Sequence, residues 1–349
     1  MSSTVWILIA LILGFLVLFQ IAKATEYVSI LKGEDKTRKD TNRINGFLLL
    51  AFLIAGLWGV WYCHQELKGK VLGAPASNHG ERIDSMIFIT LIITGIVFFI
   101  TQVLLFWFSF KYQEKENKQA FYYPHNNRLE VIWTVIPAIV LTVLVGFGLY
   151  YWFQITGEAP KNALQVEVVG KQFNWEFRYP GRDGIFGKKY YKNVDETKAN
   201  PLGQIWEDPA NHDDVYTTGE MHIVVNRPVK LLINAKDVIH DVGLVHFRMK
   251  MDAVPGIPTT MWFTPKLTTR QMREKYGPDF NYEISCDQMC GKGHFSMRGT
   301  VIVESEAEYK VWLASKKSQY EVAMASGQGA APTPTNNVDS AAANSTSMK

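Results

Sequence analysis

The first half of the chain carries four long apolar runs, each without a charged residue. Each run is close to the roughly 20 residues that a helix needs to cross a hydrocarbon core about 30 Å thick. We therefore predict four membrane-spanning helices, over residues 5–22, 46–63, 86–110 and 131–153. Pro137, inside the fourth run, is tolerated in a membrane helix when neighbouring groups satisfy the carbonyl that it leaves free.

The polar segments between the runs differ in their number of basic residues. Residues 24–45 contain five lysines and arginines and residues 111–130 contain four, whereas residues 63–85 contain three. Cytoplasmic loops carry the excess of lysine and arginine, so the first and third segments are predicted to be cytoplasmic. With four spans, the N-terminus and everything after residue 153 then lie on the outer face.

The first apolar run has a second interpretation, as a cleaved signal peptide. Ala22-Lys-Ala24 has the small-x-small form of a cleavage site. However, no basic region precedes the run, and cleavage would leave three spans and place the C-terminal half in the cytoplasm. We therefore favour an uncleaved anchor helix.

From Gln154 onward the pattern changes to short, roughly alternating, β-branched stretches separated by Gly, Pro, Asn and Asp. This pattern is typical of a compact all-β sandwich or barrel. The clearest predicted strands are residues 164–169, 221–225, 229–233 and 299–304. Residues 181–219 are polar and lack periodicity, and we interpret them as a long surface excursion between two strands.

The C-terminal region differs again. Residues 306–323 have a helical pattern, whereas the tail from about Ala325 is too poor in large apolar residues to become ordered. We therefore expect four parts: an N-terminal extension with two spans (1–80), a transmembrane helical hairpin (81–153), a β domain (154–305), and a short helix with a disordered tail (306–349).

Composition alone conceals this division. A mean hydropathy of −0.04 and 20% charged residues are typical of a soluble protein, because the apolar anchor and the polar domain average out. The net charge of +3 is small and gives no argument for nucleic-acid binding. Three cysteines are too few for a disulfide-stapled scaffold. The chain has no Cys-x-x-Cys-His motif, which excludes a haem attached to it through that motif.

The densest chemistry lies in Cys286-Asp-Gln-Met-Cys290-Gly-Lys-Gly-His294-Phe-Ser-Met297. Two thiols, an imidazole and a thioether form a ligand set that suits copper by its softness. Zinc is a rival, although structural zinc sites usually pair cysteines as Cys-x2-Cys and do not use methionine. A disulfide is the other alternative, because an outward-facing compartment is oxidising. Of the three, we favour copper.

This motif and four further segments, in the same order, resemble subunit II of a haem–copper cytochrome c oxidase with its copper A domain. The resemblance covers most of residues 86–305: a two-helix hairpin, Leu129-Glu-Val-Ile-Trp-Thr-Val-Ile-Pro137, Gly170-Lys-Gln-Phe-Asn-Trp175, and Asp237-Val-Ile-His240 followed by Lys250-Met-Asp252-Ala-Val-Pro-Gly256. It implies transmembrane helices followed by a cupredoxin-like Greek-key β-sandwich or barrel. Residues 1–80 and the tail lie outside the usual pattern of the family.

The resemblance also implies a binuclear copper centre that relays electrons. Such a subunit accepts them from a c-type cytochrome on the outer face and passes them to a haem in subunit I, where oxygen is reduced to water and protons are pumped. The ligands implied by position are two bridging thiolates, one histidine for each copper, a weak thioether and a weak backbone carbonyl: Cys286 and Cys290, His240 and His294, Met297, and Gln288. This full set argues against a quinol-oxidase subunit of the same fold without copper.

Two departures from the family pattern affect what the resemblance implies. Most members have a glutamate where this chain has Gln288, and that carboxylate helps to bind a magnesium or manganese ion at the boundary with subunit I. Hard cations prefer carboxylate oxygen, so this second metal is in doubt here. The first of two family tryptophans, where electrons usually enter, is Phe173, while Trp175 is retained. Electrons are therefore expected to enter at Phe173 and Trp175, or by a different route.

Two carboxylates match family positions outside the copper motif. Glu130 would lie at the cytoplasmic mouth of a proton path into subunit I, or would simply favour the start of its helix through the dipole. Asp252 would face subunit I. The expected partners are subunit I, other oxidase subunits and the cytochrome, with another respiratory complex as a candidate partner of the N-terminal extension. The expected location is a bacterial inner membrane.

Other histidines and the third cysteine receive no functional role. Cys63 lies at the end of a predicted span, where a half-buried apolar role suffices. Five other histidines are expected to be surface or hydrogen-bonded structural residues: His64, His79, His125, His212 and His222. His246 lies six residues after His240, but nothing in the pattern supports it as a ligand.

Overall fold

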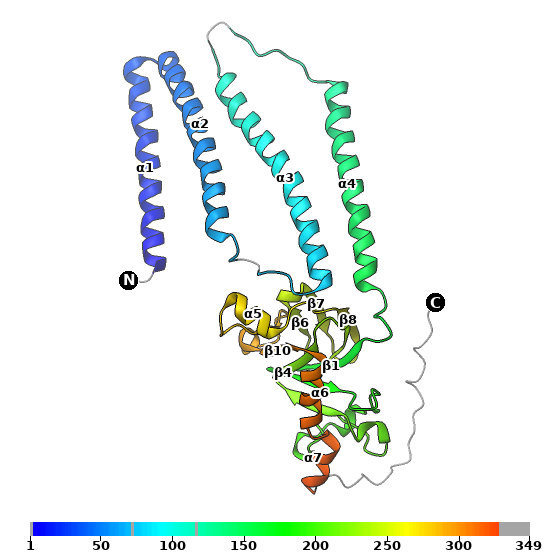
Figure 1. Ribbon diagram of the computed structural model, residues 1–349. Coiled ribbons are helices and arrows are strands. Elements are labelled where there is room, and N and C mark those ends of the chain that lie inside the picture. The colour runs from blue at the N-terminus through cyan, green and yellow to red at the C-terminus, as the bar shows by residue number, and fades with distance from the viewer. Residues whose placement is uncertain (1–2, 71–72, 116–117, 328–349) are drawn as a thin grey trace. The chain divides into compact units, whose positions relative to one another are not determined.

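The computed structural model of the chain describes residues 3–70, 73–115 and 118–327. The chain divides into two compact units, one of Met1–Gly73 with Met86–Gly146 and the other of Ala74–Ser85 with Phe147–Lys349. Helices make up the first unit, and strands dominate the second (Figure 1). The tail was predicted to be disordered from about Ala325, and residues 328–349 of it lie outside the described residues.

Four long helices correspond to the four apolar runs: α1 (Ser3–Lys32), α2 (Glu34–Leu67), α3 (Asn78–Lys111) and α4 (Asn127–Thr156). Among the described residues, all four are long and apolar enough to cross a membrane. The prediction of four such helices is therefore confirmed. Each helix is longer than its apolar run, because polar residues extend it beyond the roughly 20 residues that the hydrocarbon core requires.

The polar segment 24–45 is helical apart from one break. We predicted a loop here, and this was wrong. Its Ala, Glu, Lys, Leu and Arg residues have high helix propensity, so α1 and α2 continue through it. The break is at Gly33, whose φ of 85° lies in the left-handed region that only glycine adopts readily.

The second unit is a β-sandwich of two five-stranded sheets, with strand orders β3-β2-β1-β5-β8 and β4-β10-β9-β6-β7. Two pairs, β1 with β5 and β4 with β10, are parallel and the others are antiparallel. The strands are β1 (Leu164–Lys171), β2 (Asn174–Tyr179), β3 (Val215–Thr218), β4 (Glu220–Val224), β5 (Val229–Ala235), β6 (His240–Leu244), β7 (Met249–Ala253), β8 (Thr259–Phe263), β9 (Tyr282–Cys286) and β10 (Arg298–Glu304). The predicted all-β fold is confirmed.

Both sheets contribute side chains to one core. Along β5, buried and half-buried residues alternate, so that Val229, Leu231 and Ile233 point inward. They pack in a cluster that includes Trp175 of β2 and Val242 of β6. Each fully buried aliphatic side chain contributes about 1.5–3 kcal/mol, and the result is a rigid scaffold for the loops at the strand ends.

The excursion over residues 181–219 contains three short 3-10 helices, η1 (Tyr191–Asn193), η2 (Glu196–Lys198) and η3 (Pro209–Asn211), and ends with β3. It carries buried charged and polar residues that bind the outer side of β1 and β2. Arg178 of β2 lies with its Nε 3.1 Å from Glu167 of β1 and 3.6 Å from Asp214 of the excursion. Its Nη2 donates to the carbonyl of Gly187 at 2.9 Å. This buried ion cluster explains why the segment is polar and yet folded.

The helical pattern at residues 306–323 corresponds to two helices, α6 (Glu306–Ser315) and α7 (Gln319–Ala325), where we predicted one. Ser318 begins the second helix, because its side chain accepts a hydrogen bond from the backbone N–H of Glu321. A further helix, α5 (Thr269–Tyr276), was not predicted. It is short and begins with a capping box between Thr268 and Gln271.

Candidate metal centre

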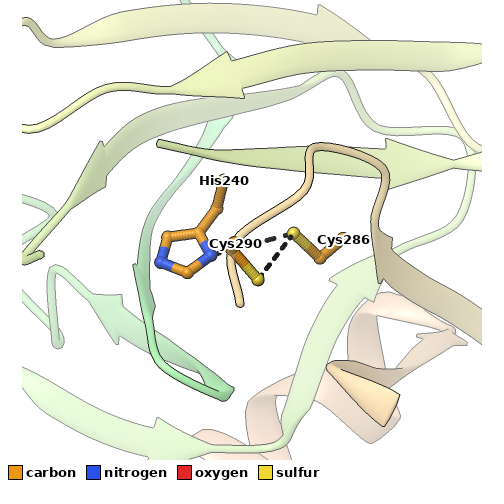
Figure 2. A group of neighbouring side chains, drawn as sticks. All are labelled: His240, Cys286 and Cys290. Carbon is orange, nitrogen blue, oxygen red and sulfur yellow. Dashed lines mark hydrogen bonds between the residues drawn. The ribbon is translucent and has the colours of Figure 1, made fainter. Parts of the chain in front are cut away.

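The candidate ligands come from two neighbouring strands and one loop. His240 is the first residue of β6 and Cys286 is the last residue of β9. These strands are antiparallel, with Val242 opposite Cys286, so the start of one lies beside the end of the other. The loop from β9 to β10 then carries Cys290, and Figure 2 shows the His240 ring and both sulfur atoms converging.

The two cysteines are free thiols. Their Sγ atoms lie 3.7 Å apart, whereas a disulfide bond is about 2.05 Å long. The pair is therefore not a disulfide in this structure, and both sulfur atoms are available as metal ligands.

Each cysteine lies beside its own histidine. The Nδ1 atom of His240 is 3.7 Å from Cys286 Sγ, and the Nδ1 atom of His294 is 3.7 Å from Cys290 Sγ. Met297 adds its Sδ atom 3.9 Å from Cys290 Sγ, and the carbonyl of Gln288 lies 3.2 Å from Cys286 Sγ. The structure thus brings all six residues into one connected set of sulfur, nitrogen and oxygen donors.

Most of this donor set is shielded from solvent. His240, Cys286, Cys290 and Met297 are buried, and His294 is half-buried. Burial, together with the neighbouring Cys286, raises the pKa of Cys290 to about 11. A pair of buried thiolates therefore needs a cation for stability, and soft sulfur donors select copper or zinc among the common metals.

His240 is oriented by a residue to which the sequence analysis gave no role. Asp237 accepts a hydrogen bond from Nε2 of His240 at 2.8 Å, which leaves Nδ1 facing the cysteines. A ligating histidine usually donates its other N–H to such a partner. Burial alone would raise the pKa of Asp237, but it is lowered by hydrogen bonds from the backbone of Gln172, from His240 and from the backbone of Val238. The sequence feature that could have indicated this role is the position of Asp237, three residues before His240.

The chain is similar to proteins of one family over both its helical and its β segments. The family profile "Cytochrome C oxidase subunit II, transmembrane domain" matches residues 69–150, and "Cytochrome C oxidase subunit II, periplasmic domain" matches residues 164–305. The alternative cytochrome c oxidase subunit 2 of Bradyrhizobium diazoefficiens is 36% identical over 247 residues, which are 70% of this chain and 83% of that protein. The chain belongs to the cytochrome c oxidase subunit II family.

Two further proteins to which the chain is similar are also described as subunit II of a cytochrome oxidase. Cytochrome c oxidase subunit 2 of Cereibacter sphaeroides is 30% identical over 233 residues, which are 65% of this chain and 73% of that protein. The crystal structure of the periplasmic domain of subunit II of the Bradyrhizobium japonicum cytochrome oxidase covers 45% of this chain and 96% of its own, with 24% identity and a TM-score of 0.31.

Family membership confirms the resemblance found in the sequence. This subunit II is a membrane-anchored protein with an extramembrane β domain, and its partners are other oxidase subunits. It is part of an oxidoreductase complex, a haem–copper oxidase, and it is the subunit through which electrons enter.

The two aromatic residues expected where electrons enter occupy different environments. Trp175 is 0% exposed, with its ring centroid 6.1 Å from that of His240. Phe173 is half-buried and lies over the ligand loop, next to Gly293. Trp175 therefore has no surface for a donor protein to touch. Met289 and Phe295, which the sequence analysis did not select, are 77% and 79% exposed.

Gly293 gives a direct test of how the ligand loop packs. A Cβ atom at this residue would lie 2.5 Å from Cγ of Phe173, far inside van der Waals contact. We expect Gly293→Ala to displace the loop, to change the spectrum of a metal ion held by the adjacent His294, and to cost about 1–3 kcal/mol, as overpacking does. Spectra and denaturant unfolding of the purified subunit measure both effects.

The control for this substitution is its partner ring. Phe173→Ala removes the atoms that the new methyl group would meet, so the double variant should regain the spectrum of Phe173→Ala alone. An unaltered spectrum in Gly293→Ala would show that the loop is not held against Phe173.

The two carboxylates outside the motif lie at the surface. Asp252 is exposed on β7, opposite the buried Asp241 of β6. Glu130 is exposed in the first turn of α4, in the other unit, and its Oε1 accepts from the backbone N–H of Asn126 at 3.4 Å. This hydrogen bond between Glu130 and Asn126 is one that a carboxylate at the start of a helix makes.

One of the remaining histidines differs from expectation. His79 was expected at the surface or hydrogen-bonded, but it is buried and neither ring nitrogen has a hydrogen-bond partner. The ring of Trp262 packs edge-on against it, with centroids 4.5 Å apart, and this contact excludes solvent. By contrast, His222 is hydrogen-bonded to Glu304 at 2.9 Å and Glu220 at 2.7 Å, as a structural role requires.

Proposed function

We propose that this subunit accepts electrons one at a time from a c-type cytochrome at a binuclear copper centre and passes them to a haem in subunit I. There oxygen is reduced to water and protons are pumped. The observation that carries the proposal is the connected set of six donors, in which each histidine lies beside a different cysteine.

The roles of the donors follow from their positions. Cys286 and Cys290 would hold the two coppers together through their sulfur atoms, and His240 and His294 would each provide one further ligand. The carbonyl of Gln288 lies near Cys286 Sγ and the Sδ atom of Met297 near Cys290 Sγ, and these two would be the weak ligands. Copper bound in this way supplies a one-electron acceptor whose potential its weak ligands and surroundings adjust. The sandwich contributes rigidity, which keeps the ligands still when the charge changes.

The proposed contact surface for the donor lies around the ligand loop. Phe173 is half-buried against this loop, and the exposed Met289 and Phe295 are neighbours of Gln288 and His294 in the chain. A contact surface of this kind would bury these exposed apolar side chains against the donor. We place the arriving electron at Phe173, with Trp175 as a buried neighbour of His240.

The other roles are proposals that rest on family position. Glu130 would begin a proton path from the cytoplasmic side, and Asp252 would face subunit I from the surface of β7. Gln288 provides an uncharged amide in place of the family's carboxylate, so we assign no magnesium or manganese ligand to its side chain. The membrane would be a bacterial inner membrane, with the β domain on its outer face.

An electron paramagnetic resonance spectrum of the purified, oxidised subunit tests the copper proposal. We expect a multi-line signal, because one unpaired electron shared by two equivalent copper nuclei couples to both. A silent spectrum after copper loading, with zinc found by metal analysis, would establish the zinc alternative instead. A four-line signal would mean a single copper.

A further inference from the structure

The turn between β1 and β2 touches the loop that carries the cysteine ligands. In this turn, the side-chain Nε2 of Gln172 donates a hydrogen bond to the backbone carbonyl of Cys290 at 2.6 Å. The two residues are 118 positions apart in the chain. The Gln172 amide therefore ties the ligand loop to the first sheet of the sandwich.

The same residue reaches the segment that carries the other ligand. The backbone N–H of Gln172 donates to Oδ2 of Asp237 at 2.7 Å. The second oxygen of that carboxylate, Oδ1, accepts from Nε2 of His240 at 2.8 Å. Gln172 thus connects two candidate ligands that belong to different segments. It reaches His240 through Asp237, by two hydrogen bonds, and it reaches Cys290 directly, by one.

Close packing leaves this connection little freedom. A Cβ atom at Gly291 would lie 3.0 Å from Nε2 of Gln172 and 3.0 Å from Cζ of Phe173. Together with the contact between Phe173 and Gly293, this places the turn directly on the loop at two glycines of the motif, Gly291 and Gly293. Gln172 is itself exposed to solvent, so its amide is held at the loop by this packing and by its hydrogen bond to the Cys290 carbonyl.

We propose that Gln172 is a positioning residue that holds the His240 segment and the Cys290 loop at one fixed separation. It contacts no metal itself and acts through Asp237 and through the Cys290 carbonyl. The inference rests on the proposed copper centre. It predicts that losing the side-chain amide changes how tightly copper is held and how the unpaired electron is shared, without unfolding the sandwich.

The variant Gln172→Met tests this in the intact oxidase. Methionine keeps the length of the side chain and removes the donor, while the backbone bond to Asp237 remains. We expect the affinity for copper, measured by competition with a chelator, to be about 10- to 100-fold lower than in the wild type. This is the usual cost of removing an outer-shell partner. The copper hyperfine pattern should also change, and the unfolding midpoint of the copper-free protein should not.

Gln165→Met is the matched control. It makes the same replacement at an exposed residue of β1, the strand that leads into the turn of Gln172. We expect copper retention and hyperfine pattern as in the wild type. If Gln172→Met assembles poorly, Gln172→Glu provides the second test, because it retains a polar side chain of the same length without the amide donor.

A second pair of variants examines the other half of the connection. Asp237→Asn weakens the link to His240, and if both residues act through one connection, the double variant with Gln172→Met should lose less copper than the two single effects combined. A normal signal and normal retention in Gln172→Met would overturn the inference, as would an equal change in Gln165→Met. Absence of a multi-line signal in the wild type would overturn the proposed function instead.

Discussion

Replacing Cys286 by serine is expected to abolish the multi-line copper signal and the reduction of the oxidase by its cytochrome donor. Cys286 Sγ is the one atom that lies next to the second thiol, a histidine and the Gln288 carbonyl at once. A serine oxygen is hard and remains protonated, so it does not bridge two coppers. The loss of electron transfer should exceed the roughly 10- to 100-fold that removal of an outer-shell partner costs.

The chain provides its own control for this experiment. Cys63 is a free, exposed cysteine on α2, and Cys63→Ser should leave both the signal and the rate unchanged. Any copper that Cys286→Ser retains should give a mononuclear spectrum. A multi-line signal that survives in Cys286→Ser would contradict the assignment of this sulfur as a bridge.

Replacing Arg178 by methionine is expected to destabilise the β domain by about 3–5 kcal/mol, which is the cost of breaking a buried ion pair from one side. Arg178 is 3% exposed and lies between the buried carboxylates of Glu167 and Asp214. Without the guanidinium, Asp214 loses its cation in a site that water does not reach, while Glu167 keeps its ion pair with Lys189. Denaturant unfolding of the purified subunit, followed by circular dichroism, measures the loss.

The destabilisation in Arg178→Met should depend on pH. Burial already raises the pKa of Asp214 to about 7 against an ordinary value of 3.8, and removing the cation raises it further. The folded state then binds more protons than the unfolded state, so stability falls as pH rises through this window. The deficit should be smaller at about pH 5 than at about pH 8.

Arg270→Met is the control for the effect of arginine loss itself. The Arg270 side chain is 73% exposed and lies 3.5 Å from Glu308 at the surface, where an ion pair contributes about 0–1 kcal/mol. Equal effects of the two substitutions would show that the cluster under the excursion is not a buried ion pair in solution.

The prediction of the local parts of this protein from sequence succeeded for a physical reason. A transmembrane helix makes all its backbone hydrogen bonds within itself, so an apolar run such as residues 86–110 suffices to predict it. The two cysteines, His294 and Met297 are likewise close in the chain, and any tight loop brings them together. The strands β1, β4, β5 and β10 alternate or are β-branched over enough residues to be recognised.

Features that depend on pairing between distant segments were missed or came only through the family resemblance. The strand β6 reads His-Asp-Val-Gly-Leu, which has little β pattern, and its pairing with β9 is what brings His240 to the cysteines. Helix α5 and the continuation of α1 and α2 through residues 24–45 were also not predicted. In the latter case polarity was taken to indicate a loop, although helix propensity is independent of polarity.

By itself the sequence therefore determined the four spans, the all-β character of the second half and the donor types at the metal centre. Only the tertiary structure decided that Trp175 is buried beside His240, that the excursion binds Arg178 of β2, and that Asp237 and Gln172 connect the two ligand segments. The first group depends on residues close together in the chain. The second depends on hydrogen bonds and burial between residues that only the packed sheets bring within reach of each other.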